Sequence, residues 1–268
     1  AVDAGCLHPR VPVTPAAGRR SPVSANEFDA VFWRRHLYWP LVGFVLVTLP
    51  FEATDLDLWC SEPFYDRQLR AWPWLENFWA STVVHKGGKY SVWVLGAVPL
   101  LVFLGGFRHA PWRAYRRVCT YVMLCLGLSP GLVAALKALT RRHCPWQIET
   151  FGGQVPWTRL FDFAPAVAVK GRYGQCFPAA HAATGFGVLC LYFAARALGC
   201  QRPARWLWPG VGLGLLFGFG QQVRGAHFAS HNLWSWLCCW LTALLLYRAF
   251  GGRAGLAPAP AGGARSRS

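Results

Sequence analysis

The chain has 268 residues, of which 54% are hydrophobic and 14% are charged, whereas a soluble domain carries about 25% charged residues. Its 27 Lys and Arg residues outnumber 11 Asp and Glu residues, which gives a formal charge of +16. These values argue against a disordered chain and against a soluble globular enzyme, and they are typical of apolar spans joined by short basic connectors. Because the arginines lie at the ends of apolar segments and form no single stripe, we expect no nucleic-acid partner.

The order of apolar segments predicts an all-α, polytopic membrane protein. Residues 1–36 are rich in Pro, Ala, Arg and Ser, so we expect a disordered cytoplasmic N-terminus. A membrane-spanning helix needs roughly 20 apolar residues, and six segments approach that length: 37–54, 90–107, 118–137, 179–199, 207–223 and 231–250. We therefore predict a six-helix membrane domain over 37–250, followed by a disordered cytoplasmic tail over 251–268.

The connectors predict the orientation of this bundle. Segments 108–117 and 196–205 and the tail after residue 250 contain several arginines and no acid. Positive charge favours the cytoplasmic side, which leaves 55–89, 138–178 and 224–230 on the opposite side. The Ala-, Arg- and Trp-rich composition favours a bacterial source, so we expect a multi-pass inner-membrane protein whose active site faces the periplasm. The Trp-rich segment 55–89 is expected to lie at the level of the lipid headgroups.

Three polar segments fall at helix ends on the predicted outer face. They are Lys137–Trp146 (KALTRRHCPW), Cys176–Phe186 (CFPAAHAATGF) and Gln221–Trp236 (QQVRGAHFASHNLWSW). Ionisable residues at one membrane boundary indicate a functional site. The outer segment 138–178 also carries five Lys and Arg residues against two acids, which favours an anionic ligand.

The order and spacing of these segments resemble the type 2 phosphatidic acid phosphatase superfamily, in its membrane-bound lipid phosphatase branch. The family pattern is K-x6-R-P, P-S-G-H and S-R-x5-H-x3-D. Here Lys137 and Pro145 match the first part, Pro178 and His181 the second, and His227 the third. The chain departs from the pattern at several positions; among them, Cys144, Ala179, Ala180, Gln221 and His231 replace Arg, Ser, Gly, Arg and Asp respectively.

The resemblance implies a role for each matched residue. His227 would be the nucleophile that forms a phosphohistidine, and His181 the general acid and base. The phosphate would be held by cationic side chains, for which the candidates are Lys137, Arg141, Arg142 and Arg224. The backbone N–H groups that begin the fourth helix would add donors. The chemistry implied needs no cofactor and no metal.

The group that orients His227 is left open by the sequence. His231, four residues on and one helical turn away, is the local candidate. No acid follows Asp162, so a carboxylate partner would have to be Glu149, Asp162 or one of the acids between residues 52 and 57, which are Glu52, Asp55 and Asp57. His227 and His231 also have the spacing of helical metal ligands, but the sequence offers no third ligand at a recognisable spacing.

Two alternatives concern the outer loop and the function. Cys144 and Cys176 flank the loop and form either a disulfide or two independent buried thiols. The expected function is hydrolysis of a membrane lipid phosphate, such as lipid A phosphate, undecaprenyl pyrophosphate or phosphatidylglycerol phosphate. A lipid phosphotransferase, a transporter and a non-catalytic scaffold are the alternatives. The sequence does not determine the oligomeric state.

Overall fold

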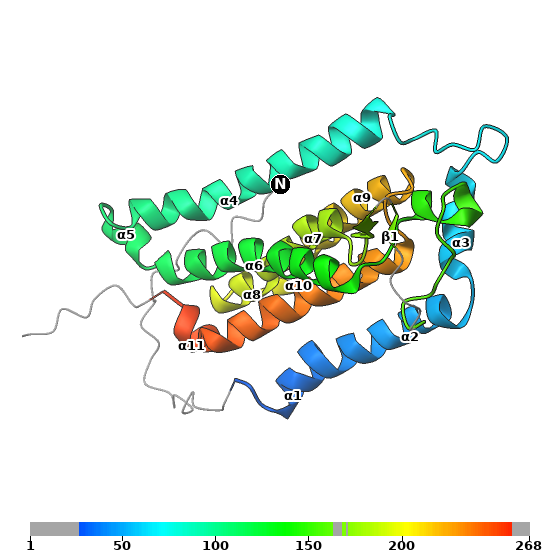
Figure 1. The fold of residues 1–268 in the computed structure, drawn as a ribbon. Helices are drawn as coiled ribbons and strands as arrows, with labels where there is room; N and C mark the ends of the chain where they lie inside the picture. Colours follow the sequence, from blue (N-terminus) through cyan, green and yellow to red (C-terminus); the bar gives the residue numbers. More distant parts are fainter. Residues whose placement is uncertain (1–26, 163–167, 170, 259–268) are drawn as a thin grey trace, which may run out of the picture.

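The computed structural model describes residues 27–162, 168–169 and 171–258. Within these residues, long helical stretches run along one common direction (Figure 1). In chain order they are α1 (Ala30–Trp33), η2 (Arg34–Tyr38) and α2 (Trp39–Ala53); η4 (Trp79–Lys86) and α4 (Gly87–Gly105); α6 (Arg116–Thr140); α7 (Ala180–Phe186), η7 (Gly187–Leu189) and α8 (Cys190–Ala197); η8 (Pro203–Trp206) and α9 (Leu207–Gln222); and α10 (Ala229–Ala249). The mostly helical fold that the sequence predicts is thus confirmed.

Short elements lie between these stretches and at the ends of the bundle. The helical ones are α3 (Leu56–Ser61), η3 (Glu62–Phe64), α5 (Ala110–Arg113), η5 (Pro145–Gln147), η6 (Glu149–Phe151) and α11 (Gly252–Leu256). The strands β1 (Ala168–Val169) and β2 (Arg172–Tyr173) form an antiparallel pair in which Ala168 lies opposite Tyr173. This pair is too short to alter the helical class of the fold.

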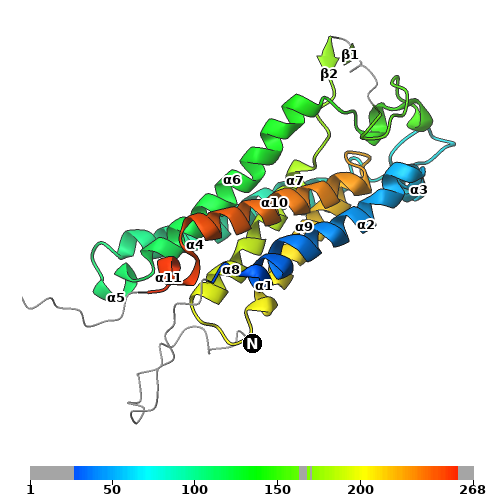
Figure 2. The same ribbon diagram turned by 90° about the horizontal axis from the view of Figure 1, so that it is seen from below.

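The bundle has two distinct ends. The Arg-rich connectors beside α5 and η8 lie with α11 at one end, whereas α3, the β1–β2 pair and the α9–α10 turn lie at the other (Figures 1 and 2). At this second end the aromatic side chains of Tyr65, Trp72, Phe151 and Phe228 pack together with Ile148 in a buried cluster. Trp59 and Trp79 are exposed, whereas Trp72 belongs to this cluster.

Both segments that the sequence predicts to be disordered termini include residues that are folded in the structure. The helix that was expected to begin near residue 37 begins at Ala30, because the Asp29 carboxylate accepts a hydrogen bond from the Phe32 N–H and caps it. At the other terminus α11 is folded, and Leu256 within it is fully buried. Residues 1–26 and 259–268, which complete the two predicted tails, lie outside the described residues.

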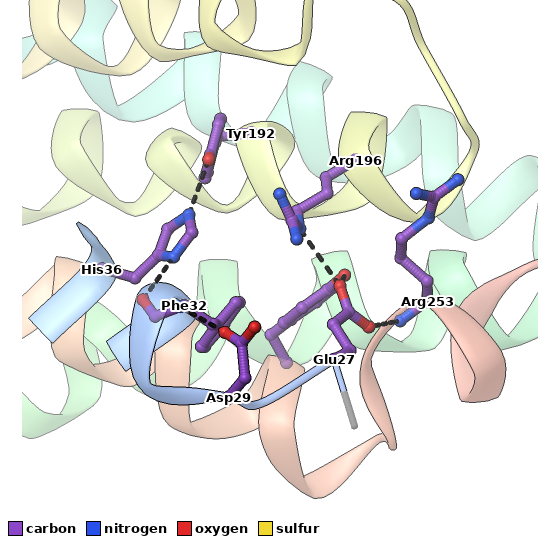
Figure 3. A network of polar contacts seen from close by, with 8 residues as sticks. Glu27, Asp29, Phe32, His36, Tyr192, Arg196 and Arg253 are labelled. Carbon is purple, nitrogen blue, oxygen red and sulfur yellow. Dashed lines mark hydrogen bonds and ion pairs between the residues drawn. The ribbon is translucent and has the colours of Figure 1, made fainter. Parts of the chain in front are cut away.

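A polar network joins the two terminal segments (Figure 3). The Glu27 carboxylate accepts hydrogen bonds from the Arg196 guanidinium at 3.1 Å, the Tyr247 hydroxyl at 2.8 Å and the Arg253 N–H at 2.6 Å. Nearby, the buried imidazole of His36 lies 2.7 Å from the Tyr192 hydroxyl. Segments before α1, in α8, in α10 and in α11 are therefore held together at the end of the bundle that carries the Arg-rich connectors.

The outer surface of the bundle is strongly apolar. Large hydrophobic side chains are exposed on successive helices, including Leu46 on α2, Trp93 and Leu101 on α4, Leu128 on α6 and Phe219 on α9. Among the described residues, two stretches are long and apolar enough to cross a membrane, Ala30–Ala53 and Arg116–Gln147. The six predicted helices are present, but length and hydropathy qualify only these two as spans.

Candidate active site

Hydrogen bonds and a disulfide connect the three polar segments that the sequence singled out. α6 ends at Thr140, and the φ of 52° at the next residue, Arg141, takes the chain out of the helix. Just beyond that end, the N–H of Cys176 donates to the carbonyl of Arg142 at 2.9 Å, and Cys144 and Cys176 form the disulfide. The N–H of Trp146 donates to the carbonyl of Gly225 at 3.1 Å. The first segment is thus fixed to the second and to the third.

The starts of α7 and α10 are also joined directly. The N–H of Ala179 donates to the carbonyl of His231 at 3.3 Å. The Ser235 hydroxyl lies 2.9 Å from both the Ala179 and the His231 carbonyl oxygens, so it can donate to either. These bonds hold the segment that carries His181 against the helix that carries His231, as the predicted convergence requires.

His227 lies at the centre of this arrangement, in the turn between α9 and α10. Its side chain is buried, and its ring centroid lies 5.9 Å from that of His231. Burial lowers the pKa of His227 well below its usual value, and the nearby His231, Lys137 and His181 lower it further. His227 is therefore a neutral imidazole near pH 7, which is the form that can act as a nucleophile.

The Nδ1 atom of His227 faces a sulfur atom and not a carboxylate. It lies 3.5 Å from Cys176 Sγ, and within the described ranges no acid forms a hydrogen bond to this ring. Glu52 and Asp162 accept bonds from the N–H groups of Phe161 and Arg159, and Asp55 pairs with the Arg159 side chain. These contacts engage three of the proposed carboxylate partners with the outer loop.

The four predicted phosphate-binding cations occupy different environments. Lys137, in the last turn of α6, is half-buried and acts electrostatically on His227 and His231. Arg142 donates to the Thr158 hydroxyl and to the carbonyls of Leu160 and Asp162, at 3.0, 2.6 and 2.8 Å. Arg142 therefore also braces the outer loop.

The other two arginines have contacts of their own. Arg141 is exposed, and its guanidinium stacks on the Tyr173 ring with 4.5 Å to the centroid. Arg224 donates to the Leu75 carbonyl at 3.0 Å and to the Gln221 side chain at 3.2 Å. Arg224 thus anchors the α9–α10 turn to the segment that precedes η4.

A cavity of about 330 Å³ opens beside these groups. Its lining includes Arg141, Arg142, Ser230 and His231, together with Asp57 from α3. The Asp57 carboxylate is buried and accepts hydrogen bonds from the Ser230 N–H at 3.0 Å and from the Ser230 hydroxyl at 2.5 Å. Burial raises the pKa of Asp57 to about 6.

Asp57 is the site residue whose contact the sequence could not identify. The sequence named it only as one of several acids that could orient His227, whereas the structure bonds it to the first turn of α10, one residue before His231. Its contact crosses 173 residues of chain, so no local motif marks it. The one available signal was the position of Asp57 on the same predicted face as the histidines.

The sequence profile of the PAP2 superfamily matches residues 118–254, from the first turn of α6 into α11. The match covers just over half of the chain. The chain belongs to the PAP2 superfamily. No curated protein and no solved structure matches it. PAP2 proteins are phosphatases that act on phosphate esters, and the PAP2 region of this chain contains Lys137, His181, His227 and His231 but not Asp57.

Proposed function

We propose that this PAP2 protein is an integral-membrane phosphatase that hydrolyses a lipid phosphate at the outer face of a bacterial inner membrane. The supporting observation is that His181, Lys137 and His231 all lie near His227, and that His231 lines a cavity at one end of an apolar bundle. The exposed apolar side chains on α2, α4, α6 and α9 favour a lipid environment. The Arg-rich connectors at the opposite end favour the cytoplasmic side for that end.

The proposed reaction has two steps. In the first, Nε2 of His227 attacks phosphorus, the bond from phosphorus to the lipid oxygen breaks, and His181 gives its proton to that oxygen. Nδ1 of His227, which faces Cys176 Sγ, then carries the remaining ring proton. In the second step water attacks the phosphohistidine, His181 takes the water proton, and inorganic phosphate leaves.

The cationic groups stabilise the charge that spreads over the phosphoryl oxygens. Phosphoryl transfer depends mainly on positioning and on such charge stabilisation. Lys137 supplies one cation beside the histidines, and Arg142 supplies another at the cavity wall. The N–H groups at the start of the helical stretch that begins with α7 add neutral donors in place of the family's serine hydroxyl.

The test uses the purified protein in detergent with a panel of lipid phosphates and EDTA, and free phosphate is measured. We expect EDTA-resistant release from at least one lipid, abolished in His227→Ala. The matched control is His109→Ala, because His109 is exposed at the start of α5 at the other end of the bundle. Normal turnover by folded His227→Ala would refute the assignment of the nucleophile.

A second measurement follows the covalent intermediate. With a ³²P-labelled aryl phosphate, whose leaving group needs little protonation, His181→Ala should accumulate acid-labile, alkali-stable label because its second step lacks a base. His227→Ala should take up no label. An added acceptor lipid distinguishes hydrolysis from transfer, since a phosphotransferase would move the label to that lipid. Absence of label from every variant and of phosphate release from every lipid would favour the scaffold alternative.

A further inference from the structure

We propose that Cys176, His227 and His231 form a redox-gated binding site for a thiophilic divalent cation such as Zn²⁺, which is open only when the Cys144–Cys176 disulfide is broken. Cation binding itself does not depend on the proposed phosphatase activity. Its consequence for turnover does, because the cation would occupy the imidazole of the proposed nucleophile. The structure supplies the third ligand that the spacing of the two histidines alone could not identify.

The geometry of the three side chains suits a metal ion. One ligand atom from each lies within 4.8 Å of the other two, and Cys176 Sγ is 3.5 Å from His227 Nδ1. Thiolate and imidazole at zinc bond lengths of about 2.3 and 2.0–2.1 Å, with tetrahedral angles, would stand between 3 and 4 Å apart, roughly as Cys176 and His227 do. All three side chains are buried, and the Nδ1 atom of His231 has no hydrogen-bond partner among the described residues.

The ligands are held in place before any metal arrives. His231 lies in the first turn of α10, His227 lies four residues earlier in the turn that leads into this helix, and Cys176 precedes α7. The bond from the Ala179 N–H to the His231 carbonyl fixes these two segments to each other. Such a site has three protein ligands, so its fourth position would be left to water or to a phosphate oxygen.

The disulfide keeps a cation out of this space. In the disulfide, Cys176 has no thiolate charge to offer, and the ammonium of Lys137 acts on both imidazoles and repels a cation. Reduction by a trialkylphosphine in water breaks the S–S bond, forms two thiols and converts the phosphine to its oxide. When Zn²⁺ then binds, the Cys176 thiol loses its proton, and the new thiolate offsets the charge of Lys137.

Cys144→Ala provides a test without any reductant, because it frees the Cys176 thiol permanently. We expect this variant to bind one equivalent of Co²⁺ with a thiolate-to-cobalt charge-transfer band, and Zn²⁺ to displace the cobalt. Oxidised wild type, Cys176→Ala and the double variant Cys144→Ala/His231→Ala should lack the band. Cys176→Ala is the matched control, since it breaks the same disulfide and keeps the free cysteines elsewhere in the chain.

The effect on activity is measured with the same proteins. Zn²⁺ should lower phosphate release by Cys144→Ala at least tenfold, EDTA should restore it, and oxidised wild type should be unaffected. A folded Cys144→Ala without the band, or the same band in Cys176→Ala, would overturn the proposal. If Cys144→Ala does not fold, phosphine-reduced wild type is titrated after removal of the phosphine, and absence of the band there has the same meaning. If oxidised wild type releases no phosphate, the proposed function fails while the cobalt result still decides the metal site.

Discussion

Asp57 shows how a single buried carboxylate ties the N-terminal third of the chain to the PAP2 region. Its oxygens accept both the N–H and the hydroxyl of Ser230, and these bonds satisfy part of the first turn of α10. Folding raises its pKa from the ordinary 3.9 to about 6, so ionisation of Asp57 opposes folding. The stability contributed by the protonated form of Asp57 is fully present below about pH 4 and is lost as the pH rises through about 6.

Asp57→Asn should remove this pH dependence. Asn keeps an acceptor for Ser230 and carries no charge, so the free energy of unfolding of the variant relative to wild type should rise by about 2 kcal/mol between pH 4 and pH 7. Thermal and denaturant unfolding in detergent at several pH values would measure the difference. The control is Glu149→Gln, an exposed acid on the same outer loop. A constant difference across this pH range would show that Asp57 is ionised without cost.

Truncation of Lys137 and truncation of Arg142 are predicted to have different effects on activity and on stability. Lys137→Ala should lower kcat/KM by about 2–4 kcal/mol of lost transition-state stabilisation, with little change in unfolding temperature. Arg142→Ala should lower both kcat/KM and the unfolding temperature, because the Arg142 guanidinium also binds three groups of the outer loop. Arg141→Ala, at an exposed position, is the control and should change neither strongly. Equal loss of activity in Arg141→Ala and Lys137→Ala would contradict this division.

The sequence located the histidines but not their surroundings. His181 and His227 stand in motifs of a few residues, so their convergence could be predicted from local pattern and from helix parity. The contacts of Cys176 with His227 and of Asp57 with Ser230 join residues 51 and 173 positions apart. Such contacts depend on how helix ends pack, which no local spacing encodes. The choice between a disulfide and two thiols was open for the same reason.

Glycines allow α7 and α9 to approach closely. A side chain on Gly214 would collide with the Phe186 ring, with a closest contact of 2.1 Å, and one on Gly185 would meet the backbone of Gly214. Gly212, one half-turn earlier on α9, faces open space. Small residues at helix crossings are a common means of association for helices in membranes. This crossing supports the helix that positions His181.

Gly214→Ala is therefore expected to destabilise the protein by about 1–3 kcal/mol through overpacking. Gly212→Ala, in the same helix, should be neutral or stabilising by up to about 1 kcal/mol because it removes a flexible helix-interior glycine. Unfolding temperature and residual activity after heating would distinguish the two variants. Equal stability of the two would mean that Phe186 moves aside at no cost.

Hydropathy predicted the positions of the helices well, but it predicted their ends less accurately. The predicted span 207–223 is realised as α9 over 207–222, whereas the predicted 37–54 lies inside a stretch that begins at Ala30. A hydropathy pattern ends where charges begin, at Arg34 and Arg35. The helix itself continues because Asp29 caps it and Phe32 packs in the core. Capping and packing, rather than apolar content, set that boundary.

The two ends of the helix bundle contain different groups of residues. One end holds the cavity, the Cys144–Cys176 disulfide and the histidines. The other end holds the Arg-rich connectors and the Glu27 network, which Figure 3 shows. The helices between them are packed through a continuous core that includes Tyr121, Phe193 and Tyr247. Stability and chemistry should therefore be separable by mutation at opposite ends.

Glu27→Ala tests this separation. The substitution leaves the Arg196 guanidinium, the Tyr247 hydroxyl and the Arg253 N–H without their shared acceptor, at a largely buried position. Loss of such an acceptor should cost about 2–4 kcal/mol in the free energy of unfolding. Glu27→Gln keeps an acceptor oxygen but loses the charge, so its loss should be smaller. Unfolding followed by Trp fluorescence would measure both.

Turnover per folded molecule, measured well below the unfolding temperature, should stay within twofold of wild type in both Glu27 variants. The physical reason is distance through the bundle, since the Glu27 network and His227 lie at opposite ends of α10. A large fall in kcat with unchanged unfolding temperature would contradict the expectation that the Glu27 network affects stability and not turnover. The network at the Arg-rich end would then act on the site through the helices that join the two ends.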